Sequence, residues 1–148
     1  PESRSAAPRE EEDDAPPHRS NAGKPGQTAS AEQVKKNRFR VIIRMVGGVP
    51  VVIDTTEAEH FKITPEKLSA AITPKTKVLV LPFPCNPTGG TMDRQDLEAI
   101  AQVLEGTDIM VLSDEIYAEL TYGQRHVSPA NLTSLKDRTI VVNGFSKS

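Results

Sequence analysis

The sequence predicts an α/β fold, a partial αβα sandwich built on a mostly parallel sheet. Three short runs are apolar on both faces, as in buried parallel strands, and they cover Val78–Leu81, Ile109–Leu112 and Thr139–Val142. Helix-like patterns alternate with these runs. Strands that alternate with helices are typical of a parallel sheet covered by helices on both sides.

The first helix of the pattern has clear start and stop signals. A β-branched run, Val49–Ile53, precedes it and fits the alternation of strands and helices. Thr64 can cap the helix, and Pro65 suits the first helical position. Pro74 ends the helix. Its apolar residues recur at helical spacing, and they are Leu68, Ala71 and Ile72.

A second helix is predicted to begin after Asp93. Asp96 follows three residues later and resembles the partner in a capping box. Gly106 suits the helix exit. After the strand Ile109–Leu112, the segment Glu115–Tyr122 predicts a further short helix. The apolar face of the second helix comprises Leu97, Ile100, Ala101 and Leu104.

The amino-terminal segment differs in composition from the rest of the chain. Residues 1–33 contain no Val, Ile, Leu, Met, Phe, Tyr, Trp or Cys, and residues 10–14 are all acidic. Such a segment cannot bury enough apolar area to offset the entropy of ordering it. We therefore expect a disordered, low-complexity tail over residues 1–38 and a domain over residues 39–148.

Composition also limits which cellular compartment and which classes of binding partner we expect. A net charge of −2 gives no basic footprint for nucleic acid. Cys85 is the single cysteine, so neither a disulfide framework nor a metal cluster is expected. The most apolar stretch, "VIIRMVGGVPVVI", is too short for a bilayer and carries an arginine. We expect a cytoplasmic protein without membrane or nucleic-acid partners, and, because residue 1 is Pro, a fragment or a processed product.

Chemically useful side chains follow each of the three strands. Asn86 comes after the first strand, Asp114 and Tyr117 come after the second, and Lys147 comes after the last. In parallel sheets the ligand lies beyond the carboxyl ends of the strands. Pyridoxal phosphate requires an amine for its aldehyde, a carboxylate for its ring nitrogen and neutral donors for its phenolic oxygen. The four residues together supply that set.

Each of the four residues also has an ordinary structural explanation when it is taken alone. Asn86 lies in a stretch, "NPTGG", that is typical of a turn. Asp114 could cap a helix, Tyr117 could be a half-buried core residue, and Lys147 could be a solvated chain end. It is their shared position after consecutive strands that favours a site.

The stretch from about Val41 to Ser148 resembles the large domain of the class I and II aminotransferases, which are fold-type I pyridoxal-phosphate enzymes. The resemblance rests on "NPTGG", "DEIY" and "FSKS", in this order and at this spacing. It implies that the chain is a truncated fragment of that domain. It also implies amino-acid metabolism: exchange of an amino group between an amino acid and a 2-oxo acid, by a parent protein that is a homodimer.

The resemblance assigns a role to each candidate residue. Lys147 matches the catalytic lysine, whose amine binds the cofactor and then moves a proton. Asp114, rather than its neighbour Glu115, matches the partner of the pyridine nitrogen. Asn86 and Tyr117 match the residues that hydrogen-bond the phenolic oxygen. The family pattern further implies a cis peptide bond between Asn86 and Pro87.

The chain also departs from the family pattern. Gly144 stands where many members carry a phosphate-binding serine, so the phosphate-binding residues stay unassigned. Other phosphate and substrate groups of the family lie outside these 148 residues, so we expect the chain alone to be inactive. Two alternatives stay open: a fold-type I lyase or decarboxylase, and a non-catalytic truncated product. A transcriptional regulator with an aminotransferase-like domain would need a DNA-binding helix-turn-helix upstream, and residues 1–33 are too polar to form one.

Overall fold

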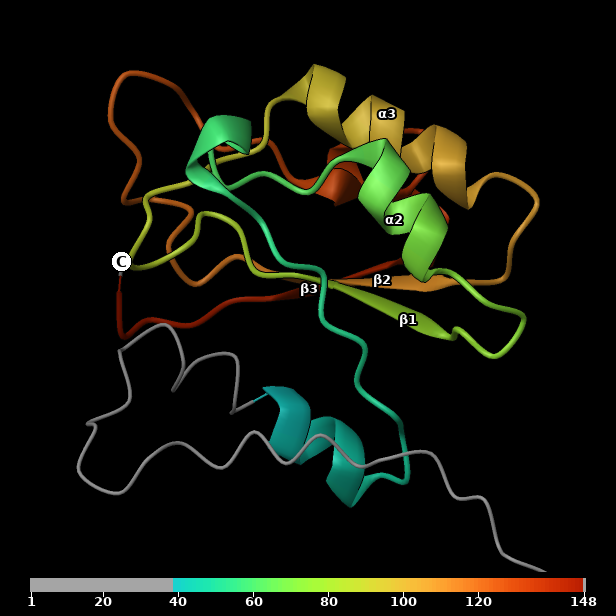
Figure 1. Ribbon diagram of the computed structural model, residues 1–148. Coiled ribbons are helices and arrows are strands. Elements are labelled where there is room, and N and C mark those ends of the chain that lie inside the picture. The colour runs from blue at the N-terminus through green and yellow to red at the C-terminus, as the bar shows by residue number, and fades with distance from the viewer. Residues whose placement is uncertain (1–38, 148) are drawn as a thin grey trace, which may run out of the picture.

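The computed structural model describes residues 39–147, and the expected tail over residues 1–38 lies outside them (Figure 1). A helical segment over residues 39–45 comes first. The elements that follow are η1 (Glu57–Glu59), α2 (Pro65–Ala71), β1 (Val78–Leu81), α3 (Arg94–Leu104), β2 (Met110–Asp114), η2 (Pro129–Asn131), η3 (Lys136–Arg138) and β3 (Thr139–Val142).

The three strands form one parallel sheet in the order β1-β2-β3, which confirms the predicted α/β fold. Leu79 lies opposite Val111, and Leu112 lies opposite Ile140. β1 and β3 have the predicted bounds, whereas β2 begins one residue later than predicted, at Met110, and ends two residues later, at Asp114. All three strands therefore end at the same edge of the sheet.

The capping residues predicted from the sequence start both helices. The Thr64 hydroxyl accepts a hydrogen bond from the backbone N–H of Lys67 at 3.4 Å, and Pro65 is the first residue of α2. Asp93 and Asp96 form a reciprocal capping box on α3, with bonds of 2.9 and 2.8 Å. Because these bonds satisfy amides that lack an intrahelical partner, local sequence is enough to fix where each helix begins.

Both α2 and α3 lie on the same face of the sheet (Figure 1). The apolar face predicted for α3 is buried, with Ile100 0% exposed. It belongs to a core with Leu81 from β1 and Val111 from β2, which are 2% and 0% exposed. Leu132 and Leu135, from the connection before β3, complete this core.

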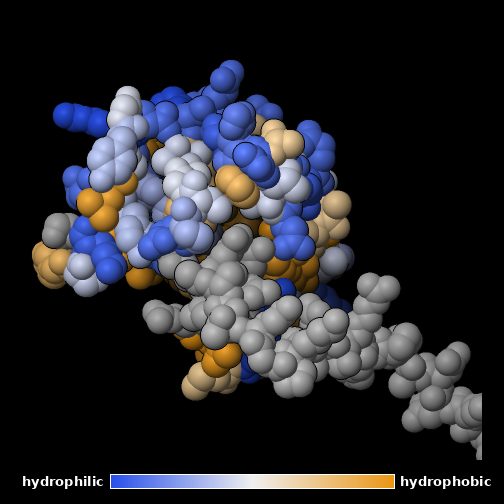
Figure 2. Space-filling model, turned by 60° about the vertical axis from the view of Figure 1, so that its left-hand side comes forward, coloured by the Kyte–Doolittle hydropathy of each residue, from blue (hydrophilic) through white to orange (hydrophobic). Residues whose placement is uncertain are grey.

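The opposite face of the sheet is much less covered by the described residues. Ile140 and Val142 are 51% and 44% exposed, and Val78 and Met110 on the same face are 51% and 37% exposed. The helical segment over residues 39–45 is drawn on this side, but Met45 within it is 80% exposed. Figure 2 shows the upper part of the molecule mainly hydrophilic, with hydrophobic colour gathered lower down.

The helix predicted over Glu115–Tyr122 is wrong. Residues 116–119 form turns, and the amides of Ala118 and Leu120 donate to carbonyls three residues earlier, at 2.9 and 3.0 Å. The Glu115 side chain is buried and held by residues further along the chain, which draws the segment out of a helical path. The run Val49–Ile53 forms no strand among the described residues, and Val49 is 87% exposed.

Within residues 39–147, no helix combines the length and the apolar character that crossing a membrane requires.

Candidate functional site

The carboxyl edge of the sheet carries the four residues that the sequence singled out. β1 leads into the loop that holds Asn86, and β2 ends at Asp114, with Tyr117 three residues on. β3 leads into the segment that holds Lys147. A backbone hydrogen bond joins the ends of β2 and β3 at this edge: the N–H of Glu115 donates to the carbonyl of Val142 at 2.8 Å.

Asn86 and Tyr117 are in direct contact. The Asn86 side-chain amide donates to the Tyr117 hydroxyl at 2.8 Å, although the two residues are 31 positions apart. The loop that carries Asn86 is closed by Cys85, whose amide donates to Gly90 and whose carbonyl accepts from Gly89. Gly89 has φ +70°, a conformation that glycine adopts without steric cost. Two neutral polar groups, from segments that follow different strands, thus meet at one point.

The peptide bond between Asn86 and Pro87 is cis, as predicted. A second cis bond joins Phe83 to Pro84, and the sequence reading did not predict it.

Asp114 is the last residue of β2 and is half-buried. Its carboxylate accepts a hydrogen bond from the amide of Ile116 at 3.4 Å, so it helps to start the turn that leads to Tyr117. It pairs with Val142 of β3 and therefore projects to the same side of the sheet as that residue.

Lys147 is exposed and follows β3 at the same edge. Gly144, within the intervening segment, packs near the β2 turn: a Cβ at this position would lie 3.3 Å from Cδ1 of Ile116. The segment that leads to Lys147 therefore runs beside the segment that carries Asp114 and Tyr117. That Lys147 acts together with them stays a prediction.

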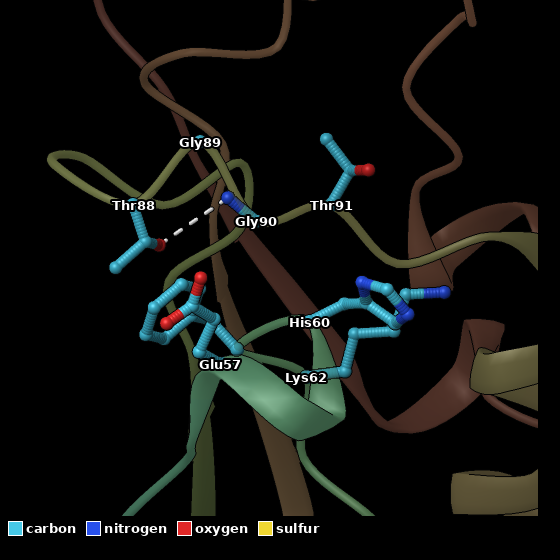
Figure 3. A pocket seen from close by; sticks show the side chains of 8 residues that line it. Glu57, His60, Lys62, Thr88, Gly89, Gly90 and Thr91 are labelled. Carbon is cyan, nitrogen blue, oxygen red and sulfur yellow. Dashed lines mark hydrogen bonds between the residues drawn. The ribbon is translucent and has the colours of Figure 1, made fainter.

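A pocket of about 300 Å³ adjoins the loop that carries Asn86 (Figure 3). It lies between the η1 region and residues 88–91, and Figure 3 shows Thr88 bonded to the amide of Gly90. Lys62 in its wall is already paired with Asp96 at 2.5 Å and with Asp93 at 3.6 Å. The pocket is lined by Glu57, His60, Phe61, Lys62, Thr88, Gly89, Gly90 and Thr91, so it is distinct from the predicted site.

A buried polar cluster lies directly behind the site, and the sequence reading did not find it. Glu115 is 6% exposed and accepts a hydrogen bond from the Ser128 hydroxyl at 2.6 Å. His126 Nε2 lies 3.1 Å from the other carboxylate oxygen. Burial raises the pKa of Glu115, but the interactions with His126, Ser128 and Ser113 outweigh it and hold that pKa below its usual range.

Residues 33–148 match the family "Aminotransferase class I and II". The chain belongs to this family. The match covers the whole carboxyl edge of the sheet, including all four predicted site residues.

Named aminotransferases are similar to this chain in sequence. A probable N-acetyl-LL-diaminopimelate aminotransferase of Bacillus subtilis is 50% identical over 110 residues, which are 74% of this chain and 27% of that protein. An aspartate aminotransferase of Geobacillus stearothermophilus is 46% identical over 108 residues, or 72% of this chain and 28% of the relative. The chain thus spans little more than a quarter of the length of these relatives.

Solved aminotransferases share the fold. Aspartate aminotransferase from Thermus thermophilus, solved with maleate, matches with a TM-score of 0.66 and 40% identity, over 72% of this chain and 27% of that one. Aromatic aminotransferase from Pyrococcus horikoshii matches with a TM-score of 0.68 and 42% identity, over 71% of this chain and 28% of that one. The parallel sheet described above is therefore part of a fold-type I aminotransferase fold.

Proposed function

We propose that this chain contributes the catalytic lysine and part of the cofactor site of a pyridoxal-phosphate-dependent aminotransferase. The observation that carries the proposal is the contact between Asn86 and Tyr117, at 2.8 Å, on the edge where Asp114 and Lys147 also lie. The relatives that bear aminotransferase names support the same reaction class.

The side chains at this edge fit the ring of the cofactor. Asn86 and Tyr117 are neutral polar groups that meet at one point, as two partners of a single oxygen must. Asp114 stands at the end of the neighbouring strand and supplies a carboxylate. When bound, pyridoxal phosphate supplies the electron sink for chemistry at the α-carbon of an amino acid.

Each residue has a specific task in this proposal. Asp114 would keep the ring nitrogen protonated, because a nearby carboxylate favours the charged form. Asn86 and Tyr117 would orient the ring through its phenolic oxygen. Lys147 would hold the cofactor through Nζ, and its amine, once neutral, would move the proton at the α-carbon of the amino acid.

We assign the substrates only as a class. The reaction exchanges an amino group between an amino acid and a 2-oxo acid, and the working protein is a homodimer in the cytoplasm. The relatives carry names for aspartate and for aromatic amino acids, so their names do not select one substrate for this chain. The 148 residues alone are expected to be inactive, since Gly144 offers no side chain to the cofactor phosphate.

Covalent labelling tests the proposal. The protein, as its cell makes it, is incubated with pyridoxal phosphate, reduced with borohydride and mapped by peptide mass spectrometry. We expect the label on Lys147, and we expect Lys147→Ala to abolish it. Lys75→Ala is the matched control, because Lys75 is an exposed lysine in the turn before β1. A label spread evenly over Lys75 and other surface lysines would contradict the proposed site.

A further inference from the structure

Glu115 stands between two proposed site residues but points away from them into the protein. Asp114 precedes it, Tyr117 follows two residues later, and both are only half-buried. Glu115 is 6% exposed, and Ser113 is the other buried polar residue among residues 39–147. A buried carboxylate is costly unless it is hydrogen-bonded or paired, so its place here calls for a physical account.

The backbone of Glu115 joins three parts of the site edge. Its N–H donates to the carbonyl of Val142, the last residue of β3, at 2.8 Å. Its carbonyl accepts from the amide of Ala118 at 2.9 Å and so closes the turn that contains Tyr117. A movement of Glu115 would displace the end of β2, its bond to β3 and the tyrosine together.

The side chain of Glu115 connects the two ends of the loop between β2 and η2. One carboxylate oxygen accepts from Ser128 at 2.6 Å, and the other lies 3.1 Å from His126 Nε2. Ser128 also caps η2, by accepting from the amide of Ala130 at 3.2 Å. Pro129 in η2 is buried, and Leu132 just beyond it belongs to the core. The carboxylate is thereby connected to the hydrophobic core.

We propose that Glu115, clamped by Ser128 and His126, is the positioning residue that holds Tyr117 against Asn86 and keeps Asp114 at the site edge. The inference rests on the proposed function for its chemical meaning. It concerns only contacts of this chain, so it can be tested without the cofactor. The interactions that surround the side chain favour its ionised form, in which both oxygens can accept.

The test compares Glu115→Ala with Glu115→Gln and with Glu119→Ala. Glutamine keeps the shape, and its side-chain oxygen can still accept from Ser128. Glu119 is an exposed glutamate in the same turn region and serves as the matched control. NMR of the cofactor-free 148-residue chain follows two readouts: amide hydrogen exchange at Ala118 and Leu120, and the side-chain amide signal of Asn86.

We expect Glu115→Ala to speed exchange at Ala118 and Leu120 at least tenfold and to shift the Asn86 side-chain signal. Glu115→Gln should remain close to the unmodified chain, and Glu119→Ala should match it. Amides of α3 should keep their exchange rates. A merely structural role would instead speed exchange in α3 to the same degree.

The proposal is overturned if Glu115→Ala leaves the Asn86 signal and the turn unchanged, or if the acceleration is equal in α3. If Glu115→Ala fails to fold, which circular dichroism reports, Ser128→Ala decides, since it removes the hydrogen bond that clamps the carboxylate. It should change the same two readouts to a smaller extent, and no change would overturn the proposal. Failure of cofactor labelling at Lys147 would instead count against the proposed function and leave these readouts unaffected.

Discussion

The two faces of the sheet, built from alternate residues of the same strands, differ in how far their side chains are exposed. Leu79, Leu81 and Val111 point toward α2 and α3 and are at most 8% exposed. Val78, Met110 and Ile140 point the other way and are 37–51% exposed. Both faces carry mainly apolar side chains. We therefore expect the covered face to contribute most of the stability of the described fold and the bare face to contribute little.

A pair of isoleucine truncations should show this difference most strongly. Ile100→Ala removes a side chain that is 0% exposed beneath the covered face, and it should lower the free energy of unfolding by about 2–5 kcal/mol. Ile140→Ala removes the same atoms from the bare face, where the residue is 51% exposed, and should cost about 1 kcal/mol or less. Urea unfolding measures both. Equal losses would mean that the two faces contribute alike.

A smaller loss should follow from weakening the helix that covers the sheet. Asp93→Ala removes the capping box of α3 and should lower the free energy of unfolding by about 0.5–2 kcal/mol. Asp108→Ala, at an exposed aspartate beyond the same helix, is the control and should be nearly neutral. If both variants unfold at the same urea concentration, the cap does not support the covered face.

The pH dependence of stability should reveal the contribution of the buried cluster around Glu115. The folded-state pKa of Glu115 lies below its usual range, so this group stabilises the fold above its unfolded-state pKa of about 4.3. That stabilisation is lost as the pH falls through the folded-state pKa. Glu115→Gln should therefore flatten the loss of stability between about pH 5 and pH 3, measured by urea unfolding at several pH values. An unchanged pH profile would contradict this assignment.

The smallest effect on stability is expected at Gly144, where β3 leads toward Lys147. A serine Cβ there would lie 3.3 Å from Cδ1 of Ile116, the mobile end of a flexible side chain, so Gly144→Ser should change stability by less than about 1 kcal/mol. The family resemblance predicts a phosphate-binding serine at this position, so the variant should bind pyridoxal phosphate up to about tenfold more tightly. Thermal unfolding and a spectrophotometric titration measure the two effects. Strong destabilisation would show that Ile116 cannot yield.

Features that depend on neighbouring residues could be predicted from the sequence. Thr64 and Asp93 start their helices through bonds to amides three residues away, and the strand tips could be located from the apolar runs before them. Predicting that Asn86 and Tyr117 lie near each other required only that parallel strands share an edge.

Features that depend on distant contacts could not be predicted in this way. The path of residues 115–122 is set by the bond from Ser128 to Glu115 across 13 positions, and no helical or strand period connects them. The unequal covering of the two sheet faces could not be predicted either, because the sequence of an apolar strand does not indicate on which face a helix will pack.

The parallel order of the strands also determines where the chain can change in length. The described connections at the amino edge, residues 72–77 before β1 and residues 105–109 before β2, lie at the opposite edge of the sheet from the four site residues. Insertions or deletions there could accumulate during evolution without disturbing the chemistry. At the carboxyl edge, where Asn86 bonds Tyr117, a single added residue would separate partners that two distant segments must supply together. Length variation among descendants of this sequence should therefore concentrate at the amino edge.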